Sequence, residues 1–209
     1  MPNSSPASSK NADLHGNVPD SSPAALLIVD MINDLEFPGA DRLAEQIMPV
    51  ARAIRELRDR AKALGIPAVY VNDNFGRWQS AQNSVIEHCL NNDVRGRPVV
   101  QLLAPEPDDY FVLKPKHSGF YSTTLDTLLA YLRASSLIIT GVAGNSCVLF
   151  TANDAFMRDY HLYVPSDCTA SIDPEDNRYA LKQMREVLGA DTRPSGELDL
   201  NALREGHGS

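Results

Sequence analysis

Short, almost wholly apolar runs alternate with longer helical patterns along this chain. The runs cover residues 24–30, 67–72, 110–114, 136–141 and 161–166. Between the first two runs, apolar residues from Leu43 to Leu64 recur every three or four positions. That spacing predicts one helix, with Asp41 as its N-cap. Strands that are apolar throughout are typical of a parallel sheet covered on both faces.

Further helices are expected within 80–92, over 123–134, around the cysteine that follows Gly141, and from Asp173 onward, whereas the stretch containing "RGRP" is expected to be a loop. The fold prediction is therefore α/β, with three layers (αβα) and a doubly wound, mostly parallel sheet of five to six strands.

The length of 209 residues suits a single globular domain. Residues 1–22 are rich in Ser, Pro and Asn and have no apolar segment of the kind found in secretory signals, so they are expected to form a flexible arm or to dock on a partner subunit. The domain is expected to span 23–192. The polar segment 193–209 is expected to be a tail in which "LDLNAL" can form a short docked turn.

The net charge of −8 argues against binding to nucleic acid or to an anionic membrane surface. The longest apolar run, Ala24 to Val29, is too short to cross a bilayer. The three cysteines, Cys89, Cys147 and Cys168, are odd in number and lack CxxC spacing, which disfavours a disulfide framework or a zinc site. Reduced thiols indicate a cytoplasmic location.

Reactive side chains stand at three of the predicted strand ends: Asp30, Lys114 and, after a glycine turn, Cys147. Alone, each has a structural interpretation as a cap, a surface amine or a core thiol. Ligands of parallel sheets, however, bind beyond the carboxyl ends of the strands. A thiolate is favoured at a helix N-terminus and beside a cation, and a carboxylate can take the thiol proton. Asn145 or Ser146 is expected to cap the helix that begins near Cys147.

Three motifs carry a resemblance that covers roughly residues 24–190: "LLIVDMINDL", "VLKPKHSGF" and "GVAGNSCVLFTANDA". In this order they resemble the isochorismatase-like cysteine hydrolase superfamily, which includes nicotinamidases, N-carbamoylsarcosine amidases and ureidoacrylate hydrolases. The resemblance implies that Asp30 is the catalytic acid/base, Lys114 its cationic partner and Cys147 the nucleophile. It also implies a cis peptide bond between Val142 and Ala143, and an oxyanion hole formed by the N–H groups of Ala143 and Cys147.

The chain departs from these relatives in two places. Nicotinamidases bind a metal through an Asp-x-His pair and a further histidine, but "NDNFGRW" has Phe75 two residues after Asp73, and no histidine occurs between 74 and 87. No metal and no cofactor are therefore expected, and nicotinamide is disfavoured as a substrate. Ile32 replaces a glutamine that is frequent in relatives, which is expected to alter the hydrogen bonds around Asn33.

Several other residues have candidate roles. His117 is an alternative base for a Cys–His pair. Asp154 is expected to form a structural ion pair, and Cys168 to be a small buried residue. Aromatic residues of the proposed pocket can equally belong to the core or to a subunit interface. The candidate pocket wall consists of Phe37, Asn72, Asp73, Phe75, Trp78 and Phe120.

The sequence thus predicts a metal-independent cysteine amidohydrolase that cleaves a small-molecule C–N bond (amide, ureido or carbamoyl) through a thioester. Two alternatives stay open: an isochorismatase-type vinyl-ether hydrolase, against which the thiol of Cys147 argues, and a non-catalytic binding or scaffold protein of the same fold. The expected partners are a small-molecule substrate and further copies of the chain, as a dimer or tetramer.

Overall fold

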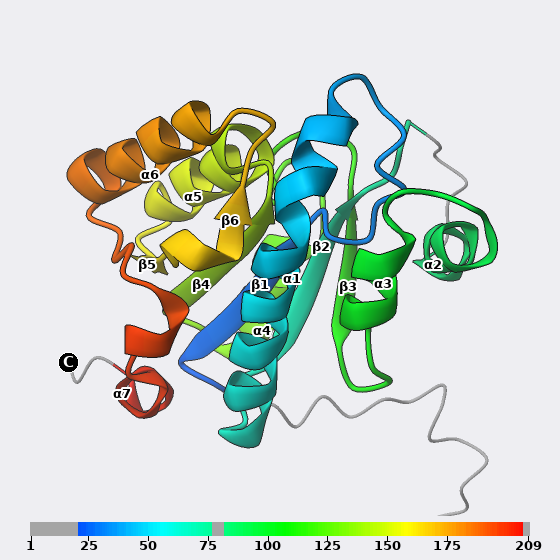
Figure 1. The fold of residues 1–209 in the computed structure, drawn as a ribbon. Coiled ribbons are helices and arrows are strands. Elements are labelled where there is room, and N and C mark those ends of the chain that lie inside the picture. Colours follow the sequence, from blue (N-terminus) through cyan, green and yellow to red (C-terminus); the bar gives the residue numbers. More distant parts are fainter. Residues whose placement is uncertain (1–20, 77–81, 207–209) are drawn as a thin grey trace, which may run out of the picture.

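The computed structural model describes residues 21–76 and 82–206. Its centre is a six-stranded parallel sheet with the strand order β3-β2-β1-β4-β5, and β6 pairs with β4 beyond the end of β5 (Figure 1). The strands are β1 (Ala24–Val29), β2 (Ala68–Asp73), β3 (Tyr110–Lys114), β4 (Ser136–Val142), β5 (His161–Tyr163) and β6 (Thr169–Ala170). The predicted parallel α/β sheet is confirmed, although the run 161–166 contributes only three residues to β5.

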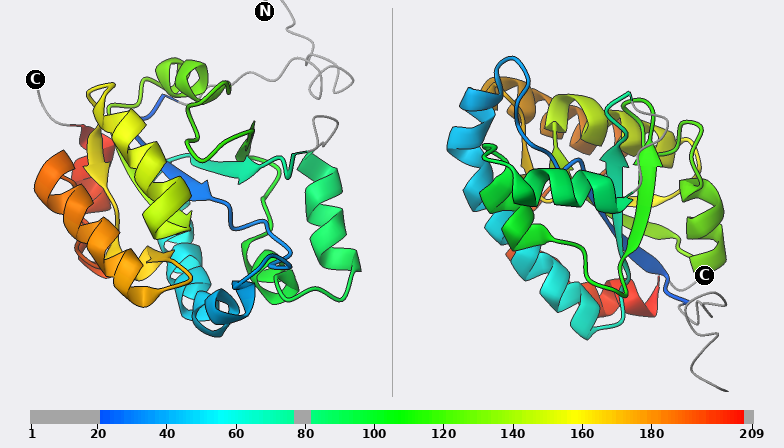
Figure 2. Two further views of the ribbon diagram at one scale, coloured as in Figure 1. Left: turned by 90° about the horizontal axis from the view of Figure 1, so that it is seen from above. Right: turned by 90° about the vertical axis from the view of Figure 1, so that its right-hand side faces the viewer.

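Helices cover both faces of the sheet (Figure 2). They are α1 (Ala40–Ala63), α2 (Gln82–Asn91), α3 (Arg97–Leu103), α4 (Leu125–Leu132), α5 (Leu149–Phe156), α6 (Pro174–Leu188) and α7 (Leu200–Glu205). Alternate residues of β1 enter two separate cores. Leu26 and Ile28 pack with α1 and α3, whereas Leu27 and Val29 pack with α4, α5 and α6. This double burial explains why β1 is apolar throughout.

Helix α1 follows the predicted apolar stripe but begins two residues earlier than expected. Gly39, with φ of 82°, stands at the N-cap without a side-chain hydrogen bond, so the expected cap by Asp41 is wrong. Leu43, Ile47 and Ile54 are buried against the sheet.

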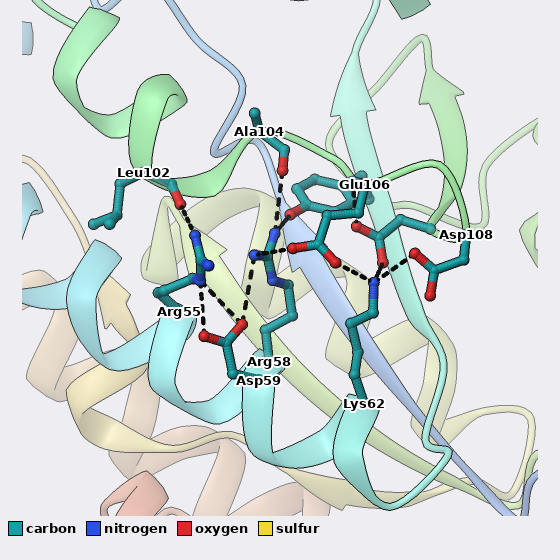
Figure 3. Close-up of polar contacts among 10 residues, drawn as sticks. Arg55, Arg58, Asp59, Lys62, Leu102, Ala104, Glu106 and Asp108 are labelled. Carbon is teal, nitrogen blue, oxygen red and sulfur yellow. Dashed lines mark hydrogen bonds and ion pairs between the residues drawn. The ribbon is translucent and has the colours of Figure 1, made fainter.

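A polar network fastens α1 to the segment that leads into β3 (Figure 3). Arg58 is fully buried and donates to the Tyr70 hydroxyl at 2.8 Å and to Glu106 Oε1 at 3.0 Å. Lys62 lies 2.7 Å from both Glu106 and Asp108. Burial alone would lower the pKa of Lys62, but these carboxylates outweigh it and raise that pKa. The network thus fixes the position of the strand that ends in Lys114.

The expected loop around "RGRP" is correct only up to Gly96, because Arg97 and Pro98 belong to a helix. Helix α3 begins at Arg97 with Pro98 in its first turn, where a missing N–H costs no helical hydrogen bond. Val99, Val100 and Leu103 are buried and hold the helix against α1. Its seven residues are too few to show a helical period in the sequence.

Both ends of the described chain belong to the fold. Ser22, the last residue of the expected arm, is buried, and its N–H donates to the Leu132 carbonyl at 2.9 Å. The rest of that arm, apart from Ser21, lies outside the described residues. In the expected tail, α7 buries Leu200 and Leu203 in the same core as α1. Within the described residues, no helix has the length and hydrophobicity needed to span a membrane.

Gly141 permits the close approach of β4 to β1 just before the cysteine segment. Its φ is +107°, and a Cβ at this position would lie 2.0 Å from the Val29 carbonyl oxygen. We therefore expect Gly141→Ala to lower the free energy of unfolding by more than about 2 kcal/mol. Gly196→Ala is the matched control, because a Cβ there meets nothing within 4 Å. Equal urea midpoints for the two variants would contradict this account.

Candidate active site

The three predicted reactive groups meet at the carboxyl edge of the sheet. Asp30 directly follows β1, Lys114 ends β3, and Cys147 lies in η2 (Gly144–Val148), the turn after β4. Lys114 Nζ is 2.8 Å from Asp30 Oδ2 and donates to Cys147 Sγ at 3.4 Å. The charge of Asp30 also acts on the thiol, whose pKa it raises. The Lys114 ammonium thus contacts both the Asp30 carboxylate and the Cys147 thiol.

The end of β2 holds Asp30 in place. Asp30 has a left-handed φ of 53°, and its Oδ1 accepts from the Asp73 N–H at 2.7 Å. Asn72 is fully buried, and its amide bonds to both the N–H and the carbonyl of Ile32, at 3.1 and 2.8 Å. Asn72, which was expected in the pocket wall, therefore holds the backbone of the loop that follows Asp30.

The segment around Cys147 is shaped by an unusual turn. The Val142–Ala143 peptide bond is cis, as the resemblance implied. The next residues form one π-helical turn, in which the Ala143 carbonyl accepts from the N–H groups of Ser146 and Val148. The N–H of Cys147, which lies between Ser146 and Val148 in the chain, does not donate to that carbonyl. Among the described residues, no backbone hydrogen bond outside the regular elements uses the N–H of Ala143 or Cys147.

The expected capping of this turn by Asn145 or Ser146 is wrong. Ala143 precedes the turn, and no side chain caps it. Instead the N–H of Asn145 donates to Ser171 Oγ at 3.0 Å, and that hydroxyl also bonds to Asn177 in α6. The cysteine turn is therefore anchored from outside by α6, which the sequence pattern does not show.

The loop after Lys114 is fastened to the helix after Cys147. Ser118 Oγ donates to Asp154 Oδ2 at 2.5 Å, and the Gly119 N–H donates to Thr151 Oγ1 at 3.0 Å. Thr151 in turn donates to the Cys147 carbonyl at 2.7 Å. Asp154 also lies 3.7 Å from Arg158, which confirms the expected structural ion pair.

The protonation state of Cys147 differs from the sequence-based expectation. Burial, together with the negative charge of Asp30, raises the pKa of Cys147 to about 12, although Lys114 acts in the opposite direction. Burial also raises the pKa of Asp30. For Lys114, burial lowers the pKa but the charges of Asp30 and Cys147 outweigh it, so that pKa is raised. At neutral pH Cys147 is therefore a thiol and Lys114 an ammonium.

The remaining pocket candidates are less closely tied to these groups. Asp73 Oδ2 lies 3.7 Å from Lys114 Nζ, at the rim of the site. Phe37 and Phe75 are 36% and 43% exposed. Phe120 is buried in the core, with the Arg158 guanidinium 4.6 Å from its ring centroid. Trp78 lies outside the described residues.

The residues after β2 do not fit the metal site of nicotinamidases. Asp73 accepts from the Phe75 N–H at 2.5 Å, and the Phe75 side chain offers no ligand atom. Over residues 21–76 and 82–206, no cluster of three or more His, Cys, Asp or Glu is arranged to hold a metal ion.

His117, the alternative base considered from the sequence, lies beside Cys147. The structure places its Nδ1 3.7 Å from Cys147 Sγ and 3.3 Å from Ser146 Oγ. The available signal was the position of His117 three residues after Lys114, in a loop that has to return over the site. Cys89 and Cys168 are buried, at 1% and 0% exposure, as expected for Cys168.

Comparisons with known proteins agree with this fold and site. A family model described as the isochorismatase domain matches residues 24–192. An uncharacterized isochorismatase family protein, YaaI of Bacillus subtilis, is 46% identical over 167 residues, which cover 80% of this chain and 91% of YaaI. The ureidoacrylate amidohydrolase RutB of Stutzerimonas stutzeri is 32% identical, over 74% of this chain and 72% of RutB.

Among solved structures, N-carbamoylsarcosine amidase from Thermoplasma acidophilum superposes with a TM-score of 0.63 at 27% identity, covering 84% of this chain and 98% of that one. The fold and site define a hydrolase of the α/β class. The chain belongs to the isochorismatase family.

The charges around the thiol predict that removing Asp30 and removing Lys114 change the rate of thiol alkylation in opposite directions. Because the pKa of Cys147 is about 12, its alkylation by iodoacetamide should rise about tenfold per pH unit between roughly 7 and 9. Asp30→Asn removes a charge that raises this pKa, so labelling should become at least about tenfold faster. Lys114→Met removes a charge that lowers it, so labelling should slow.

Peptide mapping provides the measurement, with buried Cys89 and Cys168 as internal controls that should label slowly in all three proteins. Labelling that slows in both variants would show that the charges do not set the thiol pKa.

Proposed function

We propose that this hydrolase cleaves the C–N bond of a small amide, ureido or carbamoyl compound through a thioester on Cys147. The observation that carries the proposal is the contact of Lys114 with both Asp30 and Cys147, at 2.8 and 3.4 Å. The relatives named as an amidohydrolase and an amidase support the same class of bond.

In the first half of the proposed reaction, the thiol of Cys147 attacks the carbonyl carbon while Asp30 takes its proton. The raised pKa of Asp30 suits this transfer, because it lies closer to the pKa of the thiol than the pKa of an ordinary carboxyl group does. The N–H groups of Ala143 and Cys147 donate hydrogen bonds to the substrate oxygen and stabilise the negative charge that forms there. Asp30 then protonates the departing amine, and water later hydrolyses the thioester.

Lys114 keeps its charge throughout these steps. Its ammonium stabilises whichever neighbour is negative, first the Asp30 carboxylate and then the sulfur. A binding or scaffold protein of this fold has no use for a fully buried Lys114, whose desolvation is costly. Vinyl-ether cleavage needs an acid but no thiol, so Cys147 separates the two enzymatic alternatives.

We expect Cys147→Ser to abolish ammonia release over a panel of small amides, ureas and carbamoyl compounds, because the serine hydroxyl is a far weaker nucleophile in this site. Cys89→Ala is the control and should retain turnover per folded molecule, since Cys89 is buried on α2. Cleavage of isochorismate that survives in Cys147→Ser would instead favour the vinyl-ether reaction.

Asp30→Asn should lower turnover by about 10²–10⁴, even though it speeds alkylation of the thiol.

Turnover of the wild-type enzyme should be unchanged by EDTA, because Phe75 replaces the histidine that would complete a metal site beside Asp73. Loss of activity on chelation that is restored by a divalent ion would contradict the proposal of metal independence.

A further inference from the structure

His117 contacts the reactive sulfur, as the buried ion pair does, but it differs from that pair in its exposure to solvent. Lys114 and Asp30 are 0% and 6% exposed, whereas His117 is exposed to solvent. Its Nδ1 lies 3.7 Å from Cys147 Sγ. The ring is held there by Ser146 Oγ at 3.3 Å from Nδ1 and by the ring of Phe150, with 5.4 Å between centroids.

The second half of the proposed reaction needs a base on the open side of the sulfur. Among the described residues, Asp30, Lys114 and His117 are the titratable side chains in contact with Sγ. Lys114 is an ammonium and cannot accept a proton. Asp30 serves the leaving amine in the first half and is only 6% exposed, whereas His117 lies at the solvent-exposed edge, where the water enters. A neutral imidazole at the solvent side accepts a proton from an incoming water without leaving its place.

We infer, building on the proposed thioester chemistry, that His117 is a catalytic residue that activates the water which hydrolyses the acyl-enzyme. The water oxygen attacks the thioester carbonyl while His117 Nδ1 takes one water proton. The tetrahedral intermediate then collapses, the C–S bond breaks, and the acid product leaves. The imidazolium returns the same proton to Cys147 Sγ, which restores the resting thiol, so atoms and charge balance over the step.

This assignment divides the two proton transfers between two bases. Asp30 handles the proton that passes from the thiol to the leaving amine, and His117 handles the proton that passes from water to the sulfur. Ser146 Oγ lies 3.3 Å from Nδ1 and helps to hold the ring at the site.

The test separates the two halves with p-nitrophenyl acetate, whose leaving group needs no protonation. In His117→Asn the side chain can still hydrogen-bond to Ser146 but cannot act as a base at neutral pH. We expect the burst of p-nitrophenol to keep its wild-type rate and the steady-state phase to fall by about 10². Acetylated Cys147 should accumulate in intact-mass spectra. The control is His161→Asn, an exposed histidine at the start of β5, which should leave both phases unchanged.

Three results would overturn the inference. They are steady-state turnover at the wild-type rate in His117→Asn, a slower burst with normal deacylation, and an equal slowing of both phases, which would indicate a structural role. If the wild-type protein forms no acetyl-Cys147 while its fold is intact, the proposed thiol mechanism itself fails, and the role of His117 fails with it. Melting temperatures of both variants confirm that folded proteins are compared.

Discussion

The buried ion pair between Asp30 and Lys114 is the interaction on which the arrangement of the site depends. Removing two charges from water costs several kcal/mol per ion, and attraction recovers this only when further hydrogen bonds complete the pair. Here the Asp73 N–H and the Lys116 carbonyl provide them, at 2.7 and 3.2 Å. A pair of this kind contributes little to stability, so its place at the carboxyl edge of the sheet is better explained by chemistry than by folding.

The charge balance of this pair also governs the thiol. With Asp30 negative and Lys114 positive, a neutral Cys147 leaves the cluster without a net charge. A resting thiolate would instead give this buried cluster a net negative charge. Proton transfer from sulfur to Asp30 moves the negative charge next to the same ammonium and creates none. A site of this type keeps its nucleophile protonated until a carbonyl is present, which fits a pKa raised by burial rather than lowered by a helix N-terminus.

Sequence patterns predicted the layers and the reactive residues but not their supports. The all-apolar β1 and the spacing along α1 fix a parallel sheet, and parallel strands bring Asp30 and Lys114 to one edge. The bonds that orient them join positions far apart in the chain, such as Asn72 with Ile32, 40 residues away. No local pattern records such bonds. The capping expected at Asn145 failed for a related reason, since the π turn widens the backbone where ordinary helix rules assume an α-helical start.

The loop between Lys114 and Phe120 brings two groups into contact with the sulfur from one short segment. Lys114 Nζ, at the end of β3, lies 3.4 Å from Cys147 Sγ, and His117 Nδ1 lies 3.7 Å from the same atom. The far end of the loop is bound to α5 through Ser118 and Asp154, and through Gly119 and Thr151. Because Thr151 Oγ1 also donates to the Cys147 carbonyl, the loop and the nucleophile segment are both hydrogen-bonded to Thr151 in α5. Displacement of α5 would therefore carry His117 and Cys147 together, while Lys114 stays with the sheet.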